Sequence, residues 1–152
     1  MIKIDEELEL TSFNPSDKAN LLLYMNDPVL YANTLKVPSP YTEADADSWL
    51  ELTEKECREF GHPLNWAIRS EAHGLIGGIG AFLSSGLEGH RDEIGYWLAA
   101  PFRGQGVMTK VLQAYTDYLF SSRPSLIRIE AKVYAHNPAS GRIAEKCGFE
   151  RE

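Results

Sequence analysis

Hydrophobic and polar residues follow two different periods along this chain. Apolar runs of strand length, or partial alternation of apolar and polar residues, cover residues 2–13, 65–70, 75–83, 93–99 and 127–134. Apolar residues recur every three to four positions within residues 15–25, 42–60, 107–120 and 138–147. Because side chains alternate across a strand but line one face of a helix at the longer spacing, the first set predicts strands and the second predicts helices.

The order of these elements predicts the fold class. With a last strand beginning at Phe149, the order is β-α-α-β-β-β-α-β-α-β, and residues 71–74 form a hairpin turn. We therefore expect an α/β (α+β) domain with a mixed, mostly antiparallel, twisted sheet and helices on both faces. Residues 26–41 carry three prolines and are expected to form a loop, with room for a short helical turn.

Capping residues mark the ends of the first two helices. Asn14 followed by proline is typical of a helix start, since asparagine caps the helix and proline fits its first position. Thr42 is followed by Asp45 at the spacing of a capping pair, and Gly61 is expected to end the same helix.

The bulk composition narrows the class of protein. The chain has 152 residues and a formal net charge of −7, and we expect one domain over residues 1–152. Negative charge argues against a nucleic-acid partner, and no apolar run is long enough for a membrane span, so we expect a cytoplasmic protein without a membrane partner. Cys57 and Cys147 are expected to be small buried hydrophobes in a reducing compartment, and no residue spacing resembles a metal site.

The most informative motif lies where an apolar strand becomes a helix. Its six residues are Arg103, Gly104, Gln105, Gly106, Val107 and Met108. A helix start carries backbone N–H groups that the helix cannot pair, at the positive end of its dipole, and glycine lets a bulky anion approach them. The turn therefore predicts a pyrophosphate site that is neither a P-loop nor a Rossmann turn. The alternative is a tight strand-to-helix connection that needs glycine for its geometry alone.

The pattern R-x-x-G-x-(small) in this turn resembles the acetyl-CoA signature of the GNAT superfamily of N-acyltransferases. Residues 137–140 (Asn-Pro-Ala-Ser) and 145–149 (Glu-Lys-Cys-Gly-Phe) resemble the family's N-x-x-S…K-x-G-F helix, and residues 40–42 before an acidic helix resemble the RimJ/RimL-like branch of ribosomal-protein N-terminal acetyltransferases. The resemblance covers almost the whole chain. The resemblance implies a single acyl-CoA N-acyltransferase domain over residues 1–152. Since the family usually continues with two further strands, the chain is expected to be truncated at Glu152 with its C-terminal strands missing, and the alternative is a short member of the family.

The resemblance also implies a cofactor site for acetyl-CoA. The backbone of Tyr96, Trp97 and Leu98 would pair with the pantetheine arm, and Arg103 through Met108 would hold the pyrophosphate. Met108 departs from the small residue that is common at the end of the motif. Asn137 would bond the pantetheine arm and Ser140 would face the sulfur, although both residues also fit an ordinary helix start.

Two residues are the candidates for proton transfer. By resemblance, Glu93 would act as the general base, and the alternative is a solvated carboxylate at the start of a strand. Many family members carry a tyrosine general acid where this chain has Ala144, so we expect Ser140, or a water on it, to protonate the leaving thiolate. Neither cysteine has a paired histidine, which favours direct transfer over an acyl-enzyme.

Acceptor recognition is expected in the least regular segments, residues 27–41 and 84–91. The candidate walls of an acceptor pocket are Tyr31, Leu35 and Tyr41. The alternative is that these side chains cover the hydrophobic core beneath the loop. We predict an acetyl-CoA-dependent N-acetyltransferase that acts in a ternary complex on a primary amine, either a protein N-terminus or a small amine, as a monomer or homodimer. The alternatives are a non-catalytic acyl-CoA-binding or sensing module and an interaction subunit whose sheet edge is completed by a partner strand.

Overall fold

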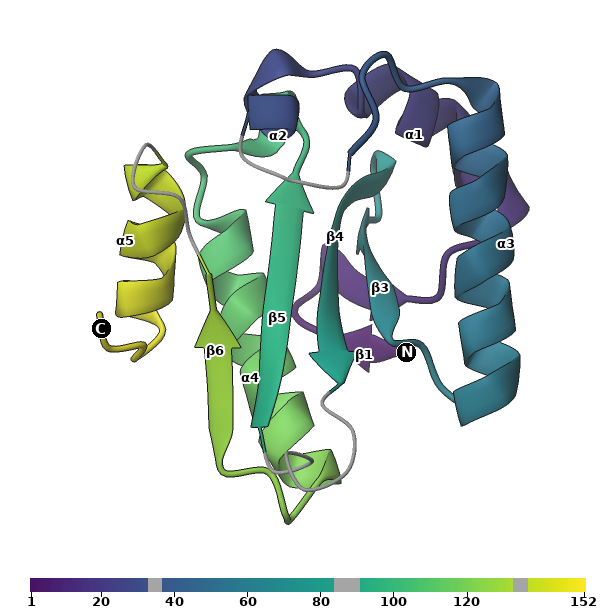
Figure 1. Ribbon diagram of the computed structural model, residues 1–152. Coiled ribbons are helices and arrows are strands. Elements are labelled where there is room, and N and C mark those ends of the chain that lie inside the picture. The colour runs from purple at the N-terminus through teal and green to yellow at the C-terminus, as the bar shows by residue number, and fades with distance from the viewer. Residues whose placement is uncertain (33–36, 84–90, 133–136) are drawn as a thin grey trace. The chain divides into compact units, whose positions relative to one another are not determined.

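The computed structural model describes residues 1–32, 37–83, 91–132 and 137–152 (Figure 1). These residues divide into two compact units. The first unit comprises residues 1–80 and 96–102, and the second comprises residues 81–95 and 103–152. The strands follow the order β1-β2-β3-β4-β5-β6 in one six-stranded sheet, and the expected mixed, mostly antiparallel architecture is confirmed.

The first unit contains most of the antiparallel strands and the N-terminal helices. Its strands are β1 (Ile2–Lys3), β2 (Leu8–Thr11), β3 (Asn65–Ser70) and most of β4 (Gly74–Leu83). Its helices are η1 (Pro15–Asp17), α1 (Lys18–Tyr24), α2 (Pro28–Ala32), α3 (Glu43–Phe60) and η3 (Ala100–Phe102). The antiparallel register places Leu10 opposite Ile68 and Trp66 opposite Ile79, so alternate apolar side chains of neighbouring strands share a face.

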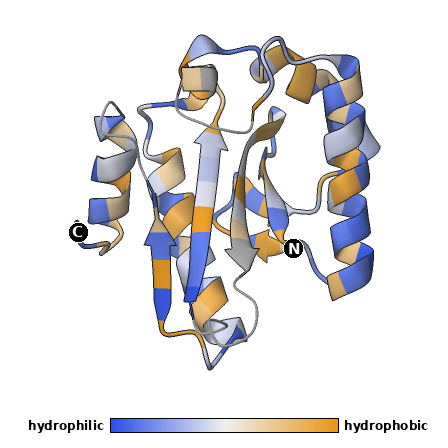
Figure 2. Ribbon diagram, viewed as in Figure 1, coloured by the Kyte–Doolittle hydropathy of each residue, from blue (hydrophilic) through white to orange (hydrophobic). Residues whose placement is uncertain are grey.

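Helices α1, α2 and α3 bury their apolar sides in one core cluster of the first unit. Its buried members are Phe13, Leu21, Met25, Leu30, Tyr41, Ala46, Ala67 and Leu75. Trp49 and Trp97 pack against it from α3 and from the end of β5. The rest of α3 carries many charged residues, visible as blue stretches of this helix in Figure 2, although Leu52 and Phe60 are also exposed. Of the described helices, none is long and apolar enough to cross a membrane.

The second unit is built on a parallel strand pair. It contains the first part of β5 (Arg91–Leu98), β6 (Arg128–Ala131), α4 (Val107–Ser122) and α5 (Pro138–Lys146). The register runs from Arg91 opposite Arg128 to Ile94 opposite Ala131. Parallel strands need a crossover connection, and α4 supplies it with an apolar face whose members are fully or nearly buried: Met108, Val111, Leu112, Tyr115 and Leu119.

Two expected elements differ from the structure, and one possibility that the sequence left open is present. The single strand expected over residues 2–13 is two strands, because the Asp5 side chain accepts hydrogen bonds from the backbone of Glu7 and Leu8 and turns the chain between them. The short helical turn allowed for in residues 26–41 is α2. The strand expected from Phe149 is wrong, since residues 149–152 have no regular structure.

Candidate functional site

The turn before α4 leaves the start of this helix open. Gly104 and Gly106 adopt left-handed backbone angles, with φ of 76° and 78°. A Cβ atom on either glycine would meet no heavy atom within 4 Å. Gly106 is the N-cap of α4 and provides no side-chain cap hydrogen bond. The first N–H groups of α4 therefore receive no acceptor from the cap residue, and open space lies beside the turn.

The start of α5 has a cap supplied by its own side chains. Asn137 Oδ1 accepts a hydrogen bond from the backbone N–H of Ser140 at 3.5 Å, and Asn137 Nδ2 donates one to Ser140 Oγ at 3.0 Å. Pro138 occupies the first position of the helix, and Ala144 is buried. The capping role that the sequence allowed for Asn137 is thus present, and its contact with a cofactor stays a prediction.

The end of β5 passes over two glycines in the first unit. A Cβ atom on Gly77 would lie 2.5 Å from the carbonyl oxygen of Trp97. A Cβ atom on Gly78 would lie 2.5 Å from Nε1 of the Trp97 indole ring. Only glycine permits this approach, because real Cβ contacts are longer. The Trp97 side chain is therefore committed to β4 and the core cluster. The register with β6 ends at Ile94, before Tyr96, Trp97 and Leu98 are reached.

Glu93 forms an ion pair that the sequence did not reveal. Its Oε2 lies 3.3 Å from Nζ of Lys132, the residue directly after β6. The Glu93 side chain is 36% exposed and that of Lys132 is 76% exposed. The candidate base is therefore half-buried and in contact with a primary ammonium group.

The neighbouring residue Asp92 has the opposite environment. It is fully buried, and its Oδ2 accepts a hydrogen bond from Arg123 Nη1 at the C-terminus of α4. Its Oδ1 has no hydrogen-bond partner in the part of the chain that the structure describes. Burial, followed by the charge of Asp92, raises the pKa of Tyr115 on α4, so this hydroxyl stays protonated. The sequence carried one signal, since strand alternation places Asp92 with Ile94 and Leu98 on the buried side of β5.

The sequence predicted buried cysteines, whereas Cys57 and Cys147 are half-buried thiols in the structure. Burial raises the pKa of Cys57 and of Cys147, and Cys147 Sγ donates to the carbonyl oxygen of Thr109 at 3.3 Å. A protonated thiol is a poor nucleophile. Among residues 1–32, 37–83, 91–132 and 137–152, no group of three or more His, Cys, Asp or Glu side chains is placed to hold a metal ion.

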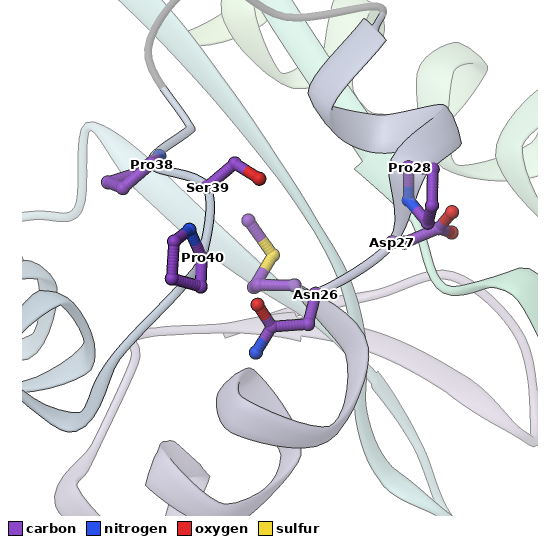
Figure 3. Close-up of a pocket in the computed structure, with 7 residues that line it drawn as sticks. Asn26, Asp27, Pro28, Pro38, Ser39 and Pro40 are labelled. Atoms are coloured by element: carbon purple, nitrogen blue, oxygen red, sulfur yellow. The ribbon is translucent and has the colours of Figure 1, made fainter.

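The segment expected to recognise the acceptor begins and ends at a small depression in the first unit (Figure 3). The depression measures about 200 Å³ and is lined by Met25, Asn26, Asp27, Pro28, Pro38, Ser39 and Pro40. The Asn26 side chain joins the two ends of this segment through two hydrogen bonds to the backbone of Tyr41. Its Nδ2 donates to the Tyr41 carbonyl oxygen at 2.9 Å, and its Oδ1 accepts from the Tyr41 N–H at 2.7 Å.

Of the three candidate acceptor residues, Tyr41 is the one whose side chain the structure describes. Tyr41 is 7% exposed and belongs to the core cluster, and burial, followed by the charge of Asp45, raises its pKa to about 12. Leu35 and the side chain of Tyr31 lie outside the described residues. A role of these residues in acceptor binding stays a prediction.

A mixed sheet, a parallel pair that ends before Tyr96 and an uncapped helix start after it are the features that the resemblance to the acyl-CoA acyltransferases implies. The family model for the GNAT acetyltransferase domain matches residues 7–150. The chain belongs to this family.

Individual relatives support the same assignment. The probable N-acetyltransferase YjcK of Bacillus subtilis is 42% identical over 59 residues, which are 39% of this chain and only 32% of that protein. The uncharacterized N-acetyltransferase p20 of Bacillus licheniformis is 30% identical over 150 residues, covering 97% of this chain and 81% of p20. The structure of RimL, a ribosomal alpha-N-protein acetyltransferase in complex with coenzyme A, matches with a TM-score of 0.83 at 20% identity, over 99% of this chain and 84% of RimL. This likeness shows the fold, and RimL is of the branch that the sequence resembles.

Proposed function

We propose that this protein is an acetyl-CoA-dependent N-acetyltransferase that moves an acetyl group directly to a primary amine in a ternary complex. The observation that carries the proposal is the open start of α4, where two glycines with left-handed backbone angles precede a helix without a side-chain cap. Backbone N–H groups at such a start bind phosphate oxygens and gain from the helix dipole.

The residues of the turn fit a pyrophosphate. The space where Cβ atoms of Gly104 and Gly106 would stand is open, and Arg103 adds a positive charge to a chain of net charge −7. Tyr96, Trp97 and Leu98 would follow the pantetheine arm with their backbone, since the Trp97 side chain is held over β4. Asn137 would bond the same arm from the start of α5. RimL, which shares the fold, is described with coenzyme A bound.

Acetyl-CoA supplies an acetyl group activated as a thioester. Glu93 would accept a proton from the acceptor's ammonium group, which makes the nitrogen nucleophilic, and Ser140 would give a proton to the departing thiolate. Positioning of amine and thioester contributes roughly 7–11 kcal/mol in favourable cases, which is why a fold that orients both reactants tolerates a modest acid such as serine. The protonated thiols of Cys57 and Cys147 support direct transfer rather than an acyl-enzyme.

The acceptor is a protein N-terminus or a small amine. The net charge of −7 suits a cationic acceptor, and RimL is named for acetylation of a protein α-amino group. Both acceptor types present the same primary ammonium group to Glu93, and the enzyme would act as a monomer or homodimer.

The test begins with a calorimetric titration of the full chain with acetyl-CoA, using dephospho-CoA and ATP as controls. We expect micromolar affinity for acetyl-CoA alone, and no binding by a folded sample would refute the proposal. Turnover is then measured with an amine acceptor. Glu93→Gln should lower turnover by about 10²- to 10⁴-fold while leaving cofactor affinity unchanged.

Glu130→Gln is the matched control for that variant. Glu130 lies directly opposite Glu93 in the β5–β6 register and is also ion-paired, with Arg91 and Arg128. The control should retain near-full turnover. Tight acetyl-CoA binding with no transfer to any amine would instead identify a non-catalytic acyl-CoA-binding module.

A further inference from the structure

The side chain of Lys132 carries a primary ammonium group, the same group as the proposed acceptor, and it contacts the proposed base Glu93. Its ε-ammonium is a primary amine, and Nζ lies 3.3 Å from Glu93 Oε2. A carboxylate that accepts a proton from a substrate ammonium needs a heavy-atom contact of about 2.6–3.2 Å, and this ion pair is only slightly longer. The pair thus has the composition and spacing expected of an acceptor nitrogen and its base.

The position of Lys132 in the fold adds a second reason. The parallel register ends at Ala131 opposite Ile94, and Lys132 is the next residue of the chain. It therefore follows the last paired residue of β6, one position beyond the level of Ile94 and two beyond Glu130, the partner of Glu93. Its side chain is 76% exposed, so its long stem has room to move, and an exposed ion pair of this kind costs at most about 1 kcal/mol to break.

We propose that Lys132 is an intramolecular acetyl acceptor, so that the enzyme modifies itself next to its own base; this rests on the proposed function. Glu93 takes one proton from the Lys132 ammonium, and the neutral Nζ attacks the thioester carbonyl carbon. An N–C bond forms and the C–S bond breaks, the second Nζ proton goes to the thiolate, and Glu93 returns its proton to solvent. The products are N-acetyl-Lys132 and coenzyme A with a free thiol.

Self-acetylation would change the site that produced it. N-acetyl-lysine carries no positive charge, so the ion pair with Glu93 is lost and the carboxylate becomes available to an external ammonium group. The unmodified Lys132 would in turn compete with external acceptors, because both groups require the same carboxylate. The modification would therefore raise the apparent affinity for cationic acceptors.

The test is site-resolved mass spectrometry after incubation of the full chain with isotope-labelled acetyl-CoA. Lys132 should be labelled at least about tenfold faster than the exposed lysines Lys55 and Lys146, and its rate per molecule should not change on tenfold dilution of the protein. Glu93→Gln should slow labelling of Lys132 by at least about tenfold and leave Lys55 and Lys146 unchanged.

Lys18 is the internal control for ion pairing as such. It also contacts carboxylates, Glu43 at 3.2 Å and Asp47 at 2.9 Å, but neither belongs to the proposed site. We expect no accelerated labelling of Lys18. Lys132→Arg, which keeps a cation for Glu93, should remove the fast label altogether.

Three outcomes would overturn the inference. Labelling of Lys132 at the rate of Lys55 would mean spontaneous chemistry, and an unchanged rate in Glu93→Gln would mean that Glu93 is not its base. Transfer to an added amine without label on Lys132 would refute self-acetylation while leaving the proposed function intact. Absence of acetyl-CoA binding in the calorimetric titration would identify the proposed function itself as the failure.

Discussion

The two helices of the second unit begin in opposite ways. At α5, Asn137 caps the helix through the Ser140 N–H and bonds the Ser140 hydroxyl, so the chain supplies this cap itself. At α4, Gly106 turns the backbone but provides no side-chain acceptor. The first unit offers a reference, since Thr42 and Asp45 form a complete reciprocal cap on α3. The comparison shows that α5 and α3 have side-chain caps and α4 has none, so the first N–H groups of α4 are open to water or to the proposed phosphates.

The largest effect is expected from a charge at the open start. Gly106→Asp places a carboxylate among the proposed phosphate contacts. Two like charges about 4 Å apart near a protein surface repel by about 4 kcal/mol. The affinity for acetyl-CoA, measured by calorimetry, should therefore fall at least about 100-fold. Gly106→Asn places a side chain of similar size in the same left-handed backbone without the charge and should lose far less affinity.

Gly61→Asp controls for the backbone cost in the first unit. Gly61 ends α3 with a φ of 76° and, like Gly106, has no heavy atom within 4 Å of the position that a Cβ atom would occupy. This variant should lose stability without losing cofactor affinity. Equal affinities for Gly106→Asp and Gly61→Asp would show that the start of α4 binds no phosphate.

A smaller effect is expected from the arginines near the two helix starts. Arg103 precedes the open turn, and Arg142 lies on the exposed side of α5. Loss of a charge-assisted hydrogen bond costs about 1.5–3 kcal/mol, so Arg103→Ala should weaken acetyl-CoA binding by roughly tenfold or more and flatten its salt dependence. Arg142→Ala should change neither quantity. The reverse ranking, measured by titration at two salt concentrations, would place the phosphates at α5.

Removal of the caps tests whether Asn137 serves the helix alone. Asn137→Ala and Thr42→Ala should each lower the free energy of unfolding by about 1 kcal/mol, which is the usual value of an N-cap. Only Asn137→Ala should also reduce acetyl-CoA affinity, because Thr42 caps a helix outside the proposed site. Thermal unfolding and calorimetry on both variants separate the two effects. If the variants differ in neither, Asn137 is a cap and nothing more.

The smallest effect concerns the proposed acid. Ser140→Ala removes the hydroxyl that accepts from Asn137 Nδ2 but keeps the backbone N–H that Asn137 caps. Turnover should fall by roughly three- to tenfold, below the range of about 10²-fold or more typical of a full general acid. Ser122→Ala, at the end of α4, is the control, since that hydroxyl donates a hydrogen bond to the Leu119 carbonyl oxygen of its own helix. Unchanged turnover in Ser140→Ala would leave water as the proton donor.

Elements with a strong local signal could be predicted from the sequence. The bounds of β3 match the expected residues 65–70, and α3 begins and ends at the expected capping residues Thr42 and Gly61. Both depend on neighbouring residues alone. The strand expected at Phe149 failed because a strand is stabilised by pairing with another segment, which no local pattern reports.

In the candidate site, too, the local motifs could be predicted from the sequence and the long-range contacts could not. The glycine turn before α4 and the cap of α5 are short motifs, so the sequence located both. The ion pair of Glu93 with Lys132 and that of Asp92 with Arg123 join residues more than thirty positions apart. These contacts depend on the register of β5 with β6 and on the length of α4, which periodicity does not specify. Alternation in β5 indicated a buried acid at Asp92, but it did not identify its partner.

Coenzyme bound at the start of α4, as proposed, would also couple folding of the chain to the supply of coenzyme. A ligand that binds only the native chain stabilises it by RT ln(1 + [L]/Kd), which is about 2.7 kcal/mol when the ligand is at 100 times its Kd. At the C-terminal end of the same helix, Arg123 already donates a hydrogen bond to the buried Asp92. Ligand binding would therefore stabilise the N-terminal end, which has no side-chain cap. Resistance of this chain to proteolysis would then rise and fall with the ratio of coenzyme concentration to Kd.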